Sequence, residues 1–292
     1  MNSAPDVPPH GDTALQLRGQ PLHTEVPVLF ETPLSVRIVD EVYARMPAQL
    51  GTVSNADARF ICSLLQILDA RLVAEVGVAA GGSSFTMLTL FDALGGDRHL
   101  FAFDILPHYY ADPSKPVGFM ALESGLPTLE RYHLFPGEGA SFLPWRVSTS
   151  APGQLLDVAF IDAHHSHPWP ALDMLATLPA VKPGGWIMLH DINLSVIAGH
   201  ELERGPSYLF ARWGGERVRQ PGSLPNIGAV QTPDPGTAFD WTLDALELPW
   251  EFSPGPEAIK PVVDLVAPLM SDAQRARLFG ILAAQAGWSD EA

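Results

Sequence analysis

The chain has 292 residues, of which 47% are hydrophobic and 17% charged, and its formal net charge is −16 at pH 7. This composition is typical of a globular protein, because a disordered chain holds fewer apolar and more charged residues. The strong negative charge disfavours nucleic acids and anionic membranes as partners. A single cysteine, Cys62, excludes an internal disulfide and a zinc site built on paired cysteines.

No apolar run approaches the roughly 20 residues that span a bilayer. The first residues, MNSAPDVPPHGDT, lack the basic start and apolar core of a secretory signal. We therefore expect a cytoplasmic protein.

Residues 1–32 are rich in proline and polar residues and are predicted to form an N-terminal arm. Helical spacing of apolar residues then extends from Pro33 to Leu68, with Ser54 or Asn55 as a helix cap inside it. Proline-rich and then helical sequence closes the chain, so we expect residues 233–292 to form a helical extension.

Short apolar runs, rich in β-branched residues, follow the first helical region, and helical patterns separate them. Near-continuous apolar strands that alternate with helices indicate a mostly parallel sheet covered on both faces, which is a doubly wound α/β fold. An irregular insert, residues 107–130, lies between the second and third strands. The predicted strands are 72–78, 99–105, 132–135, 155–163 and 185–192, and the predicted helices between them include 83–94 and 171–181.

The first predicted strand ends in a glycine-rich turn, EVGVAAGGSS, which begins at Glu75 and leads directly into a helix. Glycines let a backbone turn tightly and approach a ligand, and the start of a helix offers free N–H groups. The second strand ends in Asp104, 23 residues after Gly81, a spacing that suits a carboxylate bound to ribose hydroxyls. Ligands of open α/β sheets bind beyond the carboxyl ends of the strands, so a nucleoside cofactor is expected there.

Two cofactors suit this turn, a nicotinamide dinucleotide and S-adenosylmethionine. The dinucleotide fingerprint is G-x-G-x-x-G, and the chain has Gly77, Ala79 and Gly82 at its glycine positions. The glycine that lets the backbone approach the pyrophosphate is therefore absent. Glu75 adds negative charge, which disfavours a pyrophosphate and favours a ligand that carries a sulfonium and an ammonium group. S-adenosylmethionine is favoured, while an NAD(P)-dependent oxidoreductase and a non-catalytic nucleoside-binding protein stay as alternatives.

The stretch from Ser54 to Asn193 resembles class I methyltransferases, above all small-molecule O-methyltransferases of the catechol and caffeoyl-CoA type and bacterial enzymes of sugar and natural-product modification. A helix that leads into the E-x-G-x-x-x-G turn carries the resemblance, followed by FAFDI, LLDVAFIDAHHSHPW and KPGGWIMLHD. It implies a Rossmann-like domain over residues 33–232. The implied reaction is methyl transfer from S-adenosylmethionine to a hydroxyl of a small molecule, sugar or natural product.

The resemblance also implies roles for single residues. The methionine end of the cofactor would lie against the glycine turn, the ribose against Asp104, and the adenine against the turn after the third strand. The residues implied in cofactor binding are Glu75, Gly77, Gly81, Ser83, Ser84, Asp104, Gly137, Glu138 and Asp162.

The stretch FIDAHHSHPW adds three histidines to Asp162 at the end of the fourth strand. In the metal-dependent branch of the resembling families, this aspartate and an Asp-Asn pair after the fifth strand hold Mg²⁺. Asp191 matches the second aspartate, but Ile192 stands at the asparagine position, and Asn193, one place later, would face the other way. An Mg²⁺ ion at Asp162 and Asp191 is thus one open interpretation, because Mg²⁺ keeps several waters.

Two further interpretations use the histidines. One is a zinc or iron site formed by His164, His165, His167 and His190 with Asp162 or Asp191. The other is general-base catalysis, because His165 lies where the caffeoyl-CoA family carries its basic lysine, with His190 as the rival base. The predicted catalytic residues are His165, His190 and Asp162.

A small-molecule acceptor is the expected partner, and a homo-oligomer stays open. Contacts to the acceptor are expected from the arm, the insert and the segment 205–228. Four of its large side chains either form a wall of the acceptor site or pack a helix on the sheet: Tyr208, Phe210, Arg212 and Trp213.

Overall fold

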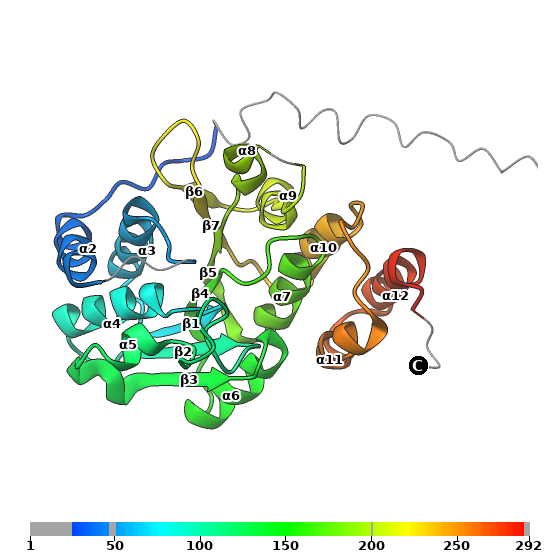
Figure 1. Cartoon of the computed structure of the whole chain (residues 1–292). Helices are drawn as coiled ribbons and strands as arrows, with labels where there is room; N and C mark the ends of the chain where they lie inside the picture. Colours follow the sequence, from blue (N-terminus) through cyan, green and yellow to red (C-terminus); the bar gives the residue numbers. More distant parts are fainter. Residues whose placement is uncertain (1–24, 47–50, 200, 289–292) are drawn as a thin grey trace, which may run out of the picture.

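The structure is a computed structural model and describes residues 25–46, 51–199 and 201–288. A seven-stranded sheet of order β3-β2-β1-β4-β5-β7-β6 runs through this part of the chain (Figure 1). Strands β1 to β5 are parallel, whereas β7 is antiparallel to both β5 and β6. The strands are β1 Leu72–Val76, β2 His99–Asp104, β3 Tyr132–Pro136, β4 Leu156–Ile161, β5 Val181–His190, β6 Arg217–Arg219 and β7 Ile227–Gln231.

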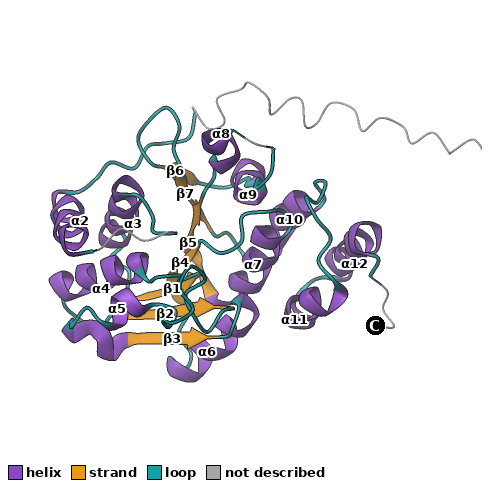
Figure 2. Cartoon of the chain, viewed as in Figure 1, coloured by secondary structure: helices purple, strands orange, loops and turns teal. Residues whose placement is uncertain are grey.

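Helices cover both faces of the sheet (Figure 2). Alternate residues of β1 show the division, because Val73 packs with helices α2, α3 and α4, whereas Ala74 packs with α6, α7, α10 and α11. The predicted doubly wound, mostly parallel fold is confirmed. The helices are α2 Pro33–Arg45, α3 Asn55–Ile67, α4 Gly82–Leu94, α5 Phe119–Leu122, α6 Leu143–Ser150, α7 Trp169–Thr177, α8 Leu194–Ala198, α9 Gly205–Arg212, α10 Pro235–Leu246, α11 Pro256–Val266 and α12 Asp272–Ala286, and the short 3₁₀ helices are η1 Pro127–Arg131, η2 Ala140–Phe142, η3 Leu178–Ala180 and η4 Ala267–Leu269.

The helical region predicted from Pro33 to Leu68 is two helices, α2 and α3. A capping box starts the second one, because the Ser54 hydroxyl accepts the Asp57 N–H while the Asp57 carboxylate accepts the Ser54 N–H. The predicted cap at Ser54 is therefore confirmed, and Asn55 is the first helical residue.

The segment after β5 forms α9, β6 and the start of β7, and these two strands were not predicted. Phe210 and Trp213 are buried against the sheet: a Cβ at Gly228 of β7 would touch the Phe210 ring, and the Trp213 Nε1–H donates to the Gln231 carbonyl at 2.9 Å. Of the two interpretations for this segment, helix packing is the one that the structure supports.

The C-terminal helices share the core of the sheet, since Phe239 and Leu243 of α10 and Ile259 of α11 lie in the same apolar cluster as β1 and β4. Most of the predicted N-terminal arm, residues 1–24, lies outside the described residues. None of the described helices is both long and apolar enough to cross a bilayer.

Candidate active site

A cavity of about 290 Å³ lies beyond the carboxyl ends of β1, β4 and β5, where the winding of the sheet reverses. The glycine turn between β1 and α4 forms one wall, and the ends of β4 and β5 form another. The volume suits a small ligand or part of a larger one. The lining residues are Gly51, Thr52, Gly77, Val78, Ala79, Ser83, Tyr110, Asp162, Ala163, His165, His190 and Asp191.

The glycine turn requires glycine at two of its positions. Gly77 and Gly81 have φ angles of +92° and +87°, which L side chains rarely adopt. A Cβ at Gly77 would lie 2.2 Å from the Asp162 carbonyl oxygen, and one at Gly81 would lie 2.7 Å from the Gly118 Cα. The turn therefore packs backbone to backbone against the end of β4 and against the insert.

Asp104 lies at the end of β2 and binds the same turn. Its Oδ2 accepts the N–H groups of Val78 and Ala79 at 3.0 and 2.9 Å, and its Oδ1 accepts the Leu106 N–H at 2.9 Å. A carboxylate already occupies two N–H groups of the turn, which argues against a pyrophosphate at this place. Contact between Asp104 and a ribose stays a prediction.

Glu75 points into the protein and does not line the cavity. Its two carboxyl oxygens accept the hydroxyls of Ser83 and Ser84 at the start of α4, and burial raises its pKa to about 8. Burial thus favours the neutral form of Glu75, which weakens the charge argument made from the sequence, whereas Asp104 and Asp162 also lie near the turn. Of these three residues of the turn and helix start, only Ser83 lines the cavity.

The residues predicted near the adenine lie beside Asp104. The Gly137 N–H donates to the Asp104 carbonyl at 2.7 Å, and Glu138 forms an ion pair with Arg146, whose Nε donates at 2.8 Å. Neither Gly137 nor Glu138 lines the cavity, and their contact with a cofactor stays a prediction.

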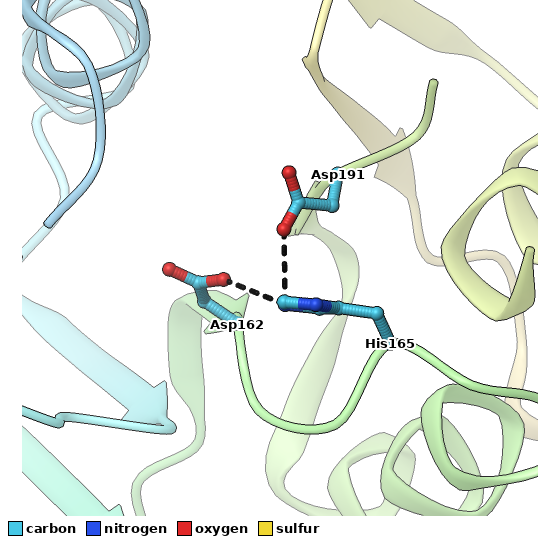
Figure 3. A group of neighbouring side chains, drawn as sticks. All are labelled: Asp162, His165 and Asp191. Atoms are coloured by element: carbon cyan, nitrogen blue, oxygen red, sulfur yellow. Dashed lines mark ion pairs between the residues drawn. The ribbon is translucent and has the colours of Figure 1, made fainter. Parts of the chain in front are cut away.

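Three predicted residues lie close together at the carboxyl ends of β4 and β5. The His165 Nε2 lies 2.9 Å from Asp191 Oδ2 and 3.5 Å from Asp162 Oδ1 (Figure 3). The loop after β4 curves round so that the His165 imidazole lies next to both carboxylates.

His190, the last residue of β5, also lies beside both carboxylates. Its Nδ1 lies 3.0 Å from Asp162 Oδ1 and 3.3 Å from Asp191 Oδ2, and its Nε2 lies 3.2 Å from the Oδ2 of Asp57 on α3. Asp57 was not predicted. In the structure it also belongs to the capping box of α3.

Asp191 has a strained backbone and a partner that was not predicted. Its φ of +59° is uncommon for a residue other than glycine, and such strain concentrates at functional sites. Its Oδ1 accepts the side-chain N–H of Asn226 at 2.7 Å, which leaves Oδ2 to face the two histidines.

The neighbouring carboxylates raise the pKa of both imidazoles. Burial lowers the pKa of His165, but Asp162 and Asp191 outweigh burial and raise this pKa to about 10. Burial also lowers the pKa of His190, and Asp162 raises it well above its usual value. The two carboxylates therefore favour the protonated form of both imidazoles.

The other two histidines of the loop point elsewhere. His164 Nδ1 accepts the Ser166 N–H at 3.1 Å, and its ring lies against Phe252 with centroids 5.5 Å apart. His167 is fully buried and packs edge-on against Tyr208 and Trp250. The predicted chelation by His165 and His167, and the zinc or iron site that includes His164, are therefore wrong.

The asparagine of the Mg²⁺ pattern has no substitute in Asn193. Its Nδ2 donates to the Pro225 carbonyl at 2.6 Å, and Ile192 is fully buried in the core. The expected facing of Asn193 away from the two aspartates is confirmed.

Glu251, between α10 and α11, fixes the loop that carries His165. Its carboxylate, on a side chain that is 3% exposed, accepts the backbone N–H groups of His167, Glu203 and Arg204 at 2.9 to 3.0 Å. Its own N–H donates to the His167 carbonyl at 3.0 Å. The C-terminal extension thus sets the path of the loop over the site.

We expect Glu251→Ala to lower turnover roughly tenfold, because it leaves three buried N–H groups unpaired, at about 1–3 kcal/mol each, and releases the loop. Glu251→Gln, which keeps one acceptor oxygen, should restore part of the rate. Steady-state kinetics would be compared with Glu247→Gln, a change in the same extension at an ion pair with Arg277. An equal loss in the Glu247 variant would show that general loosening of the extension, and not the loop, sets the rate.

Residues 74–192 match a family model described as a methyltransferase domain. Among solved structures, an O-methyltransferase from Bacillus cereus in complex with SAH is 19% identical, covers 70% of this chain and 94% of its own, and has a TM-score of 0.48. The O-methyltransferase TomG from Streptomyces achromogenes, in complex with SAM, is 16% identical, covers 70% of this chain and 92% of its own, and has a TM-score of 0.46. The SAH-bound methyltransferase PaMTH1 from Podospora anserina is 12% identical, covers 80% of this chain and 100% of its own, and has a TM-score of 0.48.

A search of curated proteins found no match. The family model covers the second part of β1, the strands β2 to β5, and the turn, insert and loop between them. Residues 74–192 of the chain therefore match a methyltransferase domain.

Proposed function

We propose that the protein transfers a methyl group from S-adenosylmethionine to a hydroxyl oxygen of a small molecule. The observation that supports this most is the placement of Asp162, His165 and Asp191 across one cavity from the glycine turn. A methyl donor on the turn and a hydroxyl at the cluster would face each other across the same cavity. Sugar, phenol and natural-product acceptors all satisfy this geometry.

The residues around the turn fit this cofactor. S-adenosylmethionine supplies the methyl group on a sulfonium, and its amino group adds a second positive charge. Asp162 borders the cavity and Asp104 binds the turn, so both place negative charge where these cations would lie. Asp104 Oδ1 and Oδ2 keep lone pairs for ribose hydroxyls beyond the backbone N–H groups that they accept.

The protein contributes alignment, exclusion of water and control of a proton. The turn, Tyr110 and the cluster would hold donor and acceptor in line, which removes much of the entropic barrier. His165 is the proposed base for the hydroxyl proton, and Asp162 and Asp191 raise its pKa to about 10. A divalent cation held by these two carboxylates would offset their charge and would also ease deprotonation of a bound hydroxyl.

The finer organisation is also part of this proposal. The catalytic domain would span residues 33–232, between the arm and the C-terminal extension. The acceptor would enter beside Tyr110 of the insert, which lines the cavity.

Asp104→Asn tests the cofactor site. The amide keeps an oxygen for the turn N–H groups but loses the charge that binds ribose, so the affinity for S-adenosylhomocysteine should fall roughly tenfold to a hundredfold. Calorimetric titration of the wild type and the variant measures this ratio.

The same titration with NADH covers the oxidoreductase alternative. Tight NADH binding without nucleoside binding would overturn the proposal. Tight S-adenosylhomocysteine binding without methyl transfer to any alcohol, phenol or sugar would favour a non-catalytic binding protein.

A further inference from the structure

We infer that Glu75 is a positioning residue for the cofactor: it takes up a proton when the ligand binds and thereby turns the Ser83 hydroxyl toward the carboxylate of the ligand. The inference deepens the proposed function and rests on it, because the ligand is S-adenosylmethionine or its product S-adenosylhomocysteine. It assigns to a buried acid, which no ligand touches, the control of a hydroxyl that a ligand reaches.

Glu75 is an acid buried without a cation. It lies on β1, between β2 and β4, and its side chain has no exposed surface. Two serine hydroxyls donate to its carboxyl oxygens, and in the described part of the chain no lysine, arginine or histidine pairs with it. An ionised carboxylate in such a place is costly, because hydroxyls replace only part of its hydration. The same burial raises the pKa of Glu75 to about 8.

The two serines that hold Glu75 differ in their other contacts. Ser84 donates to Glu75 Oε2 and accepts the Tyr132 hydroxyl at 3.1 Å, so its own hydroxyl is fixed between two protein groups. Ser83 donates to Glu75 Oε1, and among the described residues its hydroxyl has no second partner. Of the four residues in this network, Ser83 alone lines the cavity, so a ligand can act on the network only through Ser83.

The protonation state of Glu75 decides what Ser83 offers to a ligand. A carboxylate only accepts hydrogen bonds, so ionised Glu75 takes the hydroxyl protons of both serines and leaves the cavity only the lone pairs of Ser83. A proton from solvent on Oε1 reverses one bond: the acid donates to Ser83 Oγ, and the Ser83 O–H rotates toward the cavity. The bond from Ser84 to Oε2 is kept, and no covalent bond to carbon changes.

The start of α4 suits a carboxylate once Ser83 can donate. Ser83 lies in the first turn of this 13-residue helix, where unpaired N–H groups and the helix dipole favour negative charge.

The charges around Glu75 also favour proton uptake. Asp104 after β2 and Asp162 after β4 disfavour the ionised form of Glu75. The Tyr132 phenol on β3 is a neutral donor, because burial raises its pKa. A ligand carboxylate at Ser83 adds a further negative charge, which raises the pKa of Glu75 again and draws a proton onto it.

Proton uptake on ligand binding tests the inference. The chelator-treated full chain is titrated calorimetrically with S-adenosylhomocysteine at pH 8, in phosphate and in Tris, which differ in ionisation enthalpy. Because an acid is half ionised at its pKa, the wild type should take up about half a proton more per bound ligand than Glu75→Gln, whose amide cannot titrate. Proton exchange that remains in this variant belongs to the ligand amine and to other residues. Glu247→Gln, the same change in the C-terminal extension, should match the wild type.

The pH profile of the affinity gives a second readout. A ligand that binds the protonated form of Glu75 loses affinity as the pH rises through the pKa of the free protein. Between pH 7 and pH 9, the affinity of the wild type should therefore fall about tenfold more than that of Glu75→Gln.

Tight binding with equal proton uptake in the wild type and Glu75→Gln would overturn the inference. If Glu75→Gln does not fold, Ser83→Ala decides: it keeps the acid but removes its link to the cavity, so the extra half proton should disappear, and uptake equal to the wild type would refute the route through Ser83. A wild type that binds no S-adenosylhomocysteine would refute the proposed function itself, whereas binding without this proton uptake refutes the inference alone.

Discussion

Replacing His165 with alanine is expected to lower turnover roughly a hundredfold or more at saturating cofactor and acceptor. The side chain lies between Asp162 and Asp191, so its removal takes away either a proton acceptor or a metal ligand, and in both cases leaves two carboxylates facing each other. Affinity for S-adenosylhomocysteine should change little, because the nucleoside contacts are proposed at Asp104 and the glycine turn. Release of S-adenosylhomocysteine measures the rate, with an acceptor found by screening catechols, other phenols and sugars.

The neighbouring His164 provides the matched control. It has the same chemistry one residue away, but its ring lies against Phe252 and outside the cluster. His164→Asn keeps a side-chain acceptor for the Ser166 N–H and should retain nearly the full rate. A His165 variant that folds, binds the nucleoside and turns over at the wild-type rate would remove the residue from the mechanism and leave His190 as the candidate.

The parallel strands were predictable because each is buried on both faces and therefore forms a short, continuous apolar run. β1 is the clearest case: all five of its residues, Leu72–Val76, are buried, including the unusual Glu75. β6 and β7 escaped prediction for the opposite reasons. β6 has three half-buried residues, so it forms no apolar run. β7 contains a glycine that packs against the ring of Phe210, and no local sequence pattern predicts this contact.

Part of the site was predictable, because ligands of open α/β sheets bind beyond the carboxyl ends of the strands. Asp162 and Asp191 follow β4 and β5, so their meeting at one edge of the sheet follows from the fold. Asp57 lies 133 residues before His190, and Asn226 lies 35 residues after Asp191, and neither has a motif that connects it to its partner. Such contacts depend on how α3 and the loop before β7 pack on the sheet.

The direction in which each histidine side chain points could not be predicted from the sequence for a similar reason. The loop after β4 has no periodicity, so its three histidines could not be sorted by face. Contacts with the C-terminal extension distinguish the histidines. Trp250 packs against His167, Phe252 packs against His164, and Glu251 binds the backbone of the loop. His165 faces the aspartates.

Gly77→Ala is expected to lower the free energy of unfolding by about 2–5 kcal/mol, from backbone strain and overpacking together. The residue has a φ of +92°, and its Cβ would lie 2.2 Å from the Asp162 carbonyl oxygen, a backbone atom that cannot rotate away. The end of β4 must shift, and Asp162 shifts with it. Affinity for S-adenosylhomocysteine should fall in parallel, and denaturant unfolding and calorimetry measure the two effects.

Gly153→Ala separates strain from collision. Gly153 has a φ of +75°, but nothing lies within 4 Å of the position that an added methyl group would take, so its substitution should cost only the strain, about 1–2 kcal/mol. The excess loss at Gly77 then measures how rigidly the glycine turn and the end of β4 are held together. Equal losses in the two variants would mean that β4 yields to the added methyl group, and the close backbone contact would no longer explain why glycine is needed at this turn.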